Sequence, residues 1–219
     1  MIPVRKAPRP PGFDDKVRKP GLRAIAEMVG KTPSYPRRRG RPFLARYERE
    51  RDIPANEFPT YWTKALGDLM DAYGEICAYS CFRIHRVTGA ASADHFAAKS
   101  RSWRKVYLWS NYRLCCSRLN ARKREFGDVL DPFDVKPSWF QLELVGFQVK
   151  PNPRLAVALR DGIQATIDRL GLDDFRHQRE EDAERYWRGD ISLRVLREES
   201  PFVAKELRRQ GRLNPGDAW

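Results

Sequence analysis

Asp94 and His95 stand side by side in this chain, and two asparagines, Asn111 and Asn120, follow them. A neutral imidazole is suited to take a proton from water near neutral pH. Carboxylate and amide oxygens bind Mg²⁺ or Mn²⁺, and such a cation offsets charge at a scissile phosphate. These residue types suit hydrolysis of a phosphodiester. We expect Asn111 to hold the intervening loop and to orient the imidazole.

The charge around these residues supports a nucleic-acid substrate. Residues 83–124 contain 11 Lys or Arg and a single acid, Asp94. The whole chain has a net charge of +13, and clustered positive charge attracts polyanions through phosphate neutralisation and counterion release. A basic surface kept only for solubility is the alternative. The clustering favours a nuclease.

Four short segments resemble the HNH endonuclease family, whose core is a β-hairpin, a loop and one helix around a single metal ion. The similarity covers about residues 75–134. The matching segments are Ala93–Ser100, Tyr107–Leu114, Ser117–Lys123 and Val129–Phe133. The resemblance implies that His95 is the general base and that Asn111 orients it. It also implies that Asp94 and Asn120 bind Mg²⁺ or Mn²⁺, with Asn in place of the family's third His.

The cysteines depart from the pattern of many HNH proteins, which bind a structural zinc ion through two Cys-x-x-Cys pairs. Here Cys77 and Cys116 are each followed three positions later by Ser80 and Leu119, so both second thiols are missing. Structural zinc needs four Cys or His ligands. We therefore expect no structural zinc and predict that the cysteines are small core residues.

Several basic side chains are candidates for phosphate contact. Lys99, Arg122 and Lys123 flank the motif, and Arg37, Arg38 and Arg39 form the most basic run of the first 50 residues. A solvated helix or loop face explains the first three equally well, and a solvated tail explains the arginine run. Aromatic residues of segment 103–112 alternate with arginines, which suits either base stacking or core packing.

The chain divides by composition into three parts. Residues 1–56 are Pro-rich and basic, so we expect an arm without long helices and only a short helix near 22–29. We expect the HNH core and a preceding helix at 58–74 to lie in residues 57–150, and a helical region in 151–219. The fold class is then α+β, with a small ββα-metal core inside a mostly helical domain.

The pattern also predicts individual elements. Residues 76–96 favour two short strands around a turn at 87–89, and 97–110 a polar loop. A helix is expected over 112–124 and a strand pair over 141–149 around Gly146. Apolar spacing predicts a helix over 153–170 ended by Gly171, with further helices to about residue 187, at 190–198 and at 201–210.

These observations favour a metal-dependent DNA endonuclease of low sequence specificity. Since such a site needs control, and no ATP-binding loop is present, we expect it to work in a bacterial anti-phage defence assembly. An ATPase or a nucleic-acid-guided protein would be its partner. No run approaches the roughly 18–20 apolar residues of a membrane helix, so we expect a cytoplasmic protein. The alternatives are a catalytically silent DNA-binding or assembly subunit, and an RNA nuclease or toxin.

Overall fold

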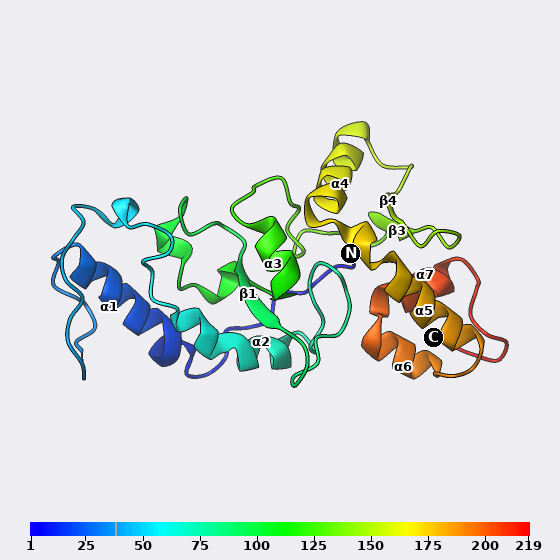
Figure 1. The fold of residues 1–219 in the computed structure, drawn as a ribbon, viewed down its shortest axis with the longest axis horizontal. Helices are drawn as coiled ribbons and strands as arrows, with labels where there is room; N and C mark the ends of the chain where they lie inside the picture. The colour runs from blue at the N-terminus through cyan, green and yellow to red at the C-terminus, as the bar shows by residue number, and fades with distance from the viewer. Residues whose placement is uncertain (38) are drawn as a thin grey trace.

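The computed structural model describes residues 1–37 and 39–219, and these residues combine helices with two small antiparallel sheets (Figure 1). The expected α+β class is confirmed at this level. In the view of Figure 1 the chain is elongated, with its first helix at one end and its last three helices at the other. Strand β1 and helix α3 lie between them. These elements are α1 (Lys19–Met28), β1 (Ala91–His95), α3 (Ser117–Lys123), α5 (Arg176–Trp187), α6 (Leu193–Glu199) and α7 (Pro201–Arg209).

The N-terminal segment contains more helix than its prolines suggest. A π-helical turn, η1 (Asp14–Arg18), runs directly into α1. Pro20 is the second residue of α1 and comes directly after the π-helical turn. Phe13 packs edge-on against Trp109 and Tyr112, with ring centroids 5.6 and 5.9 Å apart. Part of the basic N-terminal segment is therefore packed against the region that carries the motif.

The helix expected at 58–74 is present in a shorter form. It begins as the 3₁₀ helix η3 (Tyr61–Ala65) and continues as α2 (Leu66–Ala72), while η2 (Glu50–Asp52) precedes it. Gly74 follows with a left-handed φ of +58°, a conformation that favours glycine and ends the helix.

A ββα unit follows, and it corrects two predictions. Strand β1 pairs antiparallel with β2 (Tyr112–Cys116), and α3 starts at the next residue. The strand pair is thus not formed within 76–96. Of the described residues in that range, 91–95 form β1, whose partner strand lies outside it, and Ile76 and Arg83 form an isolated bridge. The helix expected over 112–124 begins at Ser117. Because four of the five β2 residues are buried, the strand lacks the alternating pattern that would mark it in the sequence.

The loop between β1 and β2 is long and held from both sides. It contains the two 3₁₀ turns η4 (Trp103–Lys105) and η5 (Trp109–Asn111). The Tyr107 hydroxyl donates to the Pro59 carbonyl at 2.8 Å, and the Trp109 indole donates to the Ala7 carbonyl at 2.9 Å. The loop is therefore anchored on the two segments that precede the ββα unit.

The C-terminal third follows the predictions more closely. The expected strand pair is β3 (Phe140–Leu142) and β4 (Val149–Pro151), followed by α4 (Val157–Leu170). Gly171 caps α4 with a φ of +58°, as its position predicted. The 3₁₀ turn η6 (Leu172–Phe175) leads into α5, and the Ser192 side chain caps α6. None of the helices in the described part of the chain combines the length and apolar character needed to cross a membrane.

Candidate active site

The ββα unit positions the motif residues through strand register and helix connection. Asp94 and His95 are the last two residues of β1, opposite Arg113 and Tyr112 of β2. Since β2 leads into α3 without a loop, Asn120 is carried back beside β1. Asp94, His95 and Asn120 line one pocket of about 390 Å³, and Ser92, Lys99 and Trp62 line it as well. The structure therefore brings the expected base and the two expected metal ligands to one place.

The His95 ring is fixed on three sides. Its Nε2 lies 3.0 Å from the Val106 carbonyl oxygen, so that nitrogen carries the proton and Nδ1 is left with a lone pair. The ring packs edge-on against Trp62 and Tyr112, with centroids 4.7 and 5.1 Å apart. Burial lowers the pKa of His95 to about 3, and the charges of Lys99 and Lys123 act in the same direction. The imidazole is therefore neutral at physiological pH.

Asp94 is buried, with 1% of its surface exposed, and both of its carboxylate oxygens have a partner. The Tyr79 hydroxyl donates to Oδ2 at 2.6 Å, and the Lys123 ammonium lies 3.0 Å from Oδ1. Burial raises the pKa of Asp94, and the Lys123 charge and the Tyr79 hydrogen bond oppose that rise. Sequence reasoning missed Tyr79, because a tyrosine upstream of the motif carries no signal of this contact.

Lys123 lies in a different place from the one expected of a phosphate contact. Only 1% of Lys123 is exposed, and its ammonium points inward to Asp94. The carbonyl oxygens of His95 and Phe96, at 3.4 and 3.3 Å, accept its other hydrogen bonds. A buried lysine needs such a set of acceptors. In this structure Lys123 is the counter-ion of Asp94 rather than a surface residue.

Asn120 has the free oxygen that a metal ligand requires. Its amide nitrogen donates to the Ser92 hydroxyl at 2.6 Å, and its side-chain oxygen accepts no hydrogen bond from any described residue. A carboxylate has about four acceptor positions, of which Tyr79 and Lys123 take two at Asp94. These free acceptor positions are oxygens, the type of ligand that a hard cation prefers. No three His, Cys, Asp or Glu side chains converge as a metal-ligand group within the described residues, and one carboxylate with one amide is not such a group.

Asn111 supports the loop rather than touching the imidazole. Its side-chain oxygen accepts from the Ala97 N–H at 2.8 Å, and its amide nitrogen donates to the Ala97 and Lys105 carbonyls at 3.1 Å each. These bonds hold the loop next to Val106, whose carbonyl oxygen faces His95. Asn111 thus bears on the orientation of the imidazole through the loop.

The remaining predicted basic residues are scattered. Lys99 lines the pocket, whereas Arg122 donates to the Leu170 and Gly171 carbonyls at 2.9 and 3.1 Å and pairs with Asp174. Arg37 donates to Glu27 at 3.0 Å. Arg39 is exposed, and Arg38 lies outside the described residues. Of this predicted set, the structure places only Lys99 at the pocket.

The four positions that correspond to the zinc-binding Cys-x-x-Cys pairs are buried or partly buried. They are Cys77, Ser80, Cys116 and Leu119. The Cys77 and Cys116 side chains are hydrogen-bonded to each other, and the Ser80 N–H donates to the Cys77 sulfur at 3.5 Å. Leu119 is fully buried in the hydrophobic core. The four residues thus pack as a mixed polar and apolar cluster.

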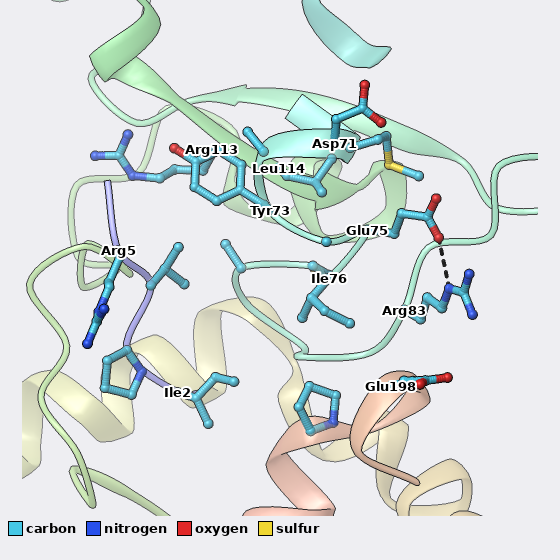
Figure 2. Close-up of a pocket in the computed structure, with 18 of the residues that line it drawn as sticks. Ile2, Arg5, Asp71, Tyr73, Glu75, Ile76, Arg83, Arg113, Leu114 and Glu198 are labelled. Atoms are coloured by element: carbon cyan, nitrogen blue, oxygen red, sulfur yellow. Dashed lines mark hydrogen bonds and ion pairs between the residues drawn. The ribbon is translucent and has the colours of Figure 1, made fainter. Parts of the chain in front are cut away.

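A larger pocket, of about 760 Å³, contains none of the predicted site residues (Figure 2). Figure 2 shows Ile2 and Glu198 on one side and Tyr73 and Arg113 on another. Its cations are largely neutralised, because Arg83 pairs with Glu75 and Glu199, Arg86 with Glu75 and Asp71, and Arg113 with Asp131. This cavity is therefore separate from the motif residues.

Comparison with known proteins adds no relative. No model of a known protein family matches this chain, and no curated protein sequence matches it either.

Proposed function

We propose that this protein is a metal-dependent endonuclease that hydrolyses DNA phosphodiester bonds at the pocket of Asp94, His95 and Asn120. The observation that carries the proposal is their convergence on one pocket of about 390 Å³. The pocket lies in a stretch with 11 basic residues and one acid, which favours a phosphate-bearing substrate. The order strand, loop, strand, helix supports membership of the HNH family, in a form without structural zinc.

His95 acts as the general base in this proposal. The Val106 carbonyl accepts the proton on Nε2, so the lone pair on Nδ1 is available to a water molecule. Burial keeps the imidazole neutral, so the Nδ1 lone pair can accept that proton, and the lowered pKa makes it a weaker base than a free imidazole. Asn111 holds the loop that carries Val106, so it positions the base indirectly.

Asp94 and Asn120 would hold Mg²⁺ or Mn²⁺ through their free oxygen positions. Such a cation acts as a Lewis acid on the scissile phosphate and offsets charge on the departing oxygen. Tyr79 and Lys123 each hold one oxygen of the Asp94 carboxylate, so a cation would bind at the remaining acceptor positions of those oxygens. Lys99 supplies positive charge at the pocket for the phosphate itself.

We place this activity in the cytoplasm, in a bacterial anti-phage defence assembly beside an ATPase or a nucleic-acid-guided partner. In this proposal the basic residues around the motif contact phosphates, which carry no base sequence, and a partner would direct or restrain cleavage. Native mass spectrometry of the endogenously tagged protein tests this part. A complex with such a partner is expected, and a free monomer alone would contradict it.

A catalytically silent DNA-binding or assembly subunit is the second candidate. One observation favours it: the Lys123 ammonium already occupies the cation position next to Asp94, at 3.0 Å. In that case DNA binding would be unaffected by His95→Ala and by a chelator.

Nicking of supercoiled plasmid in Mn²⁺ or Mg²⁺ separates the two candidates. We expect the wild type to nick the plasmid, a chelator to stop it, and His95→Ala to slow it by about 10²- to 10⁴-fold. His177→Ala is the matched control, because His177 is exposed on α5, and it should leave the rate unchanged. A wild type that binds DNA without cutting it would favour the silent subunit. A labelled RNA in the same assay tests the third alternative, an RNA nuclease.

A further inference from the structure

Trp62 brings an aromatic wall to the pocket from outside the ββα unit. It lies in η3, is partly exposed, and lines the same pocket as Asp94 and Asn120. Its ring meets the His95 ring edge-on at 4.7 Å and an interplanar angle of 88°. Trp62 could not be selected from residue spacing, because it precedes the motif by a whole helix and a long turn.

Lys99 lies directly over this aromatic ring. Its ammonium is 4.5 Å from the Trp62 ring centroid, which is a cation–π contact. Lys99 takes part in none of the ion pairs among the described residues, and Glu125 acts on its charge from the same pocket. A flat apolar ring and a partly buried cation thus stand together at the pocket, and such a pair suits a base and its phosphate.

The site is too recessed to suit a stiff duplex. Only 1% of Asp94 and 8% of His95 is exposed. Double-stranded DNA is stiff, with a persistence length of about 150 base pairs. A duplex therefore cannot fold one of its phosphates into a recessed pocket as a single strand can. An unpaired strand bends freely and presents its bases to aromatic rings.

We infer that the pocket takes an unpaired DNA strand, with one base stacked on Trp62 and the adjoining phosphate bound by Lys99. On binding, the Lys99 ammonium moves from the ring to the phosphate and leaves the ring face to the base. Cleavage of that strand rests on the proposed function, whereas its binding does not.

Two further cation–aromatic pairs lie on the same two segments. The Lys64 ammonium is 5.3 Å from the Tyr61 ring, and the Arg104 guanidinium is 4.5 Å from the Trp103 ring. Tyr61 and Trp103 are partly exposed, in contrast to Tyr107, Trp109 and Tyr112, which are core residues. These pairs offer two more partly exposed rings to a flexible strand.

The test measures binding and cleavage separately. Binding of a labelled 20-nucleotide single strand of DNA and of its blunt duplex is followed by fluorescence anisotropy in a chelator, where the proposed cleavage is stopped. We expect the single strand to bind more tightly. Trp62→Leu should weaken single-strand binding about tenfold and duplex binding about twofold or less. Trp62→Phe, which keeps a ring, should stay within about threefold of the wild type.

Trp187→Leu is the matched control, because Trp187 is a partly exposed tryptophan on α5 away from the pocket. It should change neither affinity. Equal binding of single strand and duplex, or Trp62 variants that bind the single strand like the wild type, would overturn the inference. If Trp62→Leu does not fold, the affinity of Trp62→Phe for the single strand and the preference of the wild type for single strand over duplex still test the inference.

Cleavage of both substrates in Mn²⁺ distinguishes the two proposals. Tight, Trp62-dependent single-strand binding without any cutting supports this inference and counts against the nuclease. Cutting of the duplex as fast as the single strand supports the nuclease and overturns the inference.

Discussion

Two buried aspartates, Asp94 in the ββα unit and Asp182 in α5, show how neighbours decide what a carboxylate can do. They are 1% and 7% exposed, and burial raises the pKa of each. Each also borders a pocket, of about 390 Å³ for Asp94 and about 620 Å³ for Asp182. Burial and a cavity alone therefore do not distinguish them.

The hydrogen-bonding partners do distinguish them. Asp182 accepts from the Ser200 hydroxyl and from the Gln178 amide, at 3.0 Å for the latter, and so ties α5 to the junction of α6 and α7. Asp94 is instead paired with a buried ammonium and adjoins a neutral imidazole. The histidine of the Asp182 pocket, His85, has a 56% exposed side chain and faces Glu199. Asp94 is thus held by a buried charge beside an imidazole, whereas Asp182 ties helices together through neutral groups.

The largest expected difference is in catalysis. Asp94→Asn should reduce plasmid cleavage to the level of His95→Ala, because an amide is a weaker ligand for Mg²⁺ than a carboxylate. Asp182→Asn should leave the rate within about twofold of the wild type, since its pocket takes no part in the proposed chemistry. Initial rates at saturating metal are the measurement. An Asp94→Asn protein that is folded and fully active would remove Asp94 from the site.

The next effect is on stability. Lys123→Met should lower the free energy of unfolding by about 3–5 kcal/mol, because it leaves Asp94 buried without its counter-ion. Adding Asp94→Asn should recover part of that loss. Lys150→Met, at an exposed position of β4, is the control and should change stability by less than about 0.5 kcal/mol. Urea unfolding of the four proteins gives these values. No loss in Lys123→Met would mean that the pair is not buried in solution.

Asp182→Ala should lower the free energy of unfolding by less than Lys123→Met does. It leaves the Ser200 hydroxyl and the Gln178 amide without their acceptor but strands no charge. We expect a loss of about 1–3 kcal/mol in the free energy of unfolding. The same urea measurement applies. A loss equal to that of Lys123→Met would show that the two carboxylates do not differ in the way described.

The smallest effect concerns pH. Because burial raises the pKa of Asp182 above its ordinary value of 3.8, the folded protein binds this proton more readily than the unfolded chain. Its contribution to stability should therefore grow as pH falls through the raised pKa toward 3.8. The asparagine of Asp182→Asn cannot titrate. As pH falls across that range, the free energy of unfolding of the wild type should therefore rise relative to that of Asp182→Asn. A constant difference would contradict the pKa shift.

The sequence predicted the parts of the site that depend on local spacing. Asp94, His95 and Asn120 were selected by residue type and spacing, and they meet because β2 pairs with β1 and leads directly into α3. The strands themselves were placed less well, since both were expected within 76–96 and a helix was expected from residue 112. The cap of α4 by Gly171 was predictable for the same reason, since one residue sets the conformation.

The parts that depend on packing were not predictable. Lys123 and Lys99 are both basic residues near the motif, yet one is buried against Asp94 and the other lies over Trp62. Nothing in their types separates them, because burial of a lysine is decided by the carbonyl and carboxylate groups that surround it. The strand β2 was missed because burial on both faces removes its alternation.

Binding of Mn²⁺ tests the central claim most directly. Electron paramagnetic resonance would count the Mn²⁺ held by the His95→Ala protein with a DNA oligonucleotide bound, which separates binding from cleavage. We predict one Mn²⁺ per chain, lost when Asp94→Asn is added and retained when Asp182→Asn is added. No bound Mn²⁺ in the parent protein, or equal binding in both double variants, would contradict a metal site at Asp94.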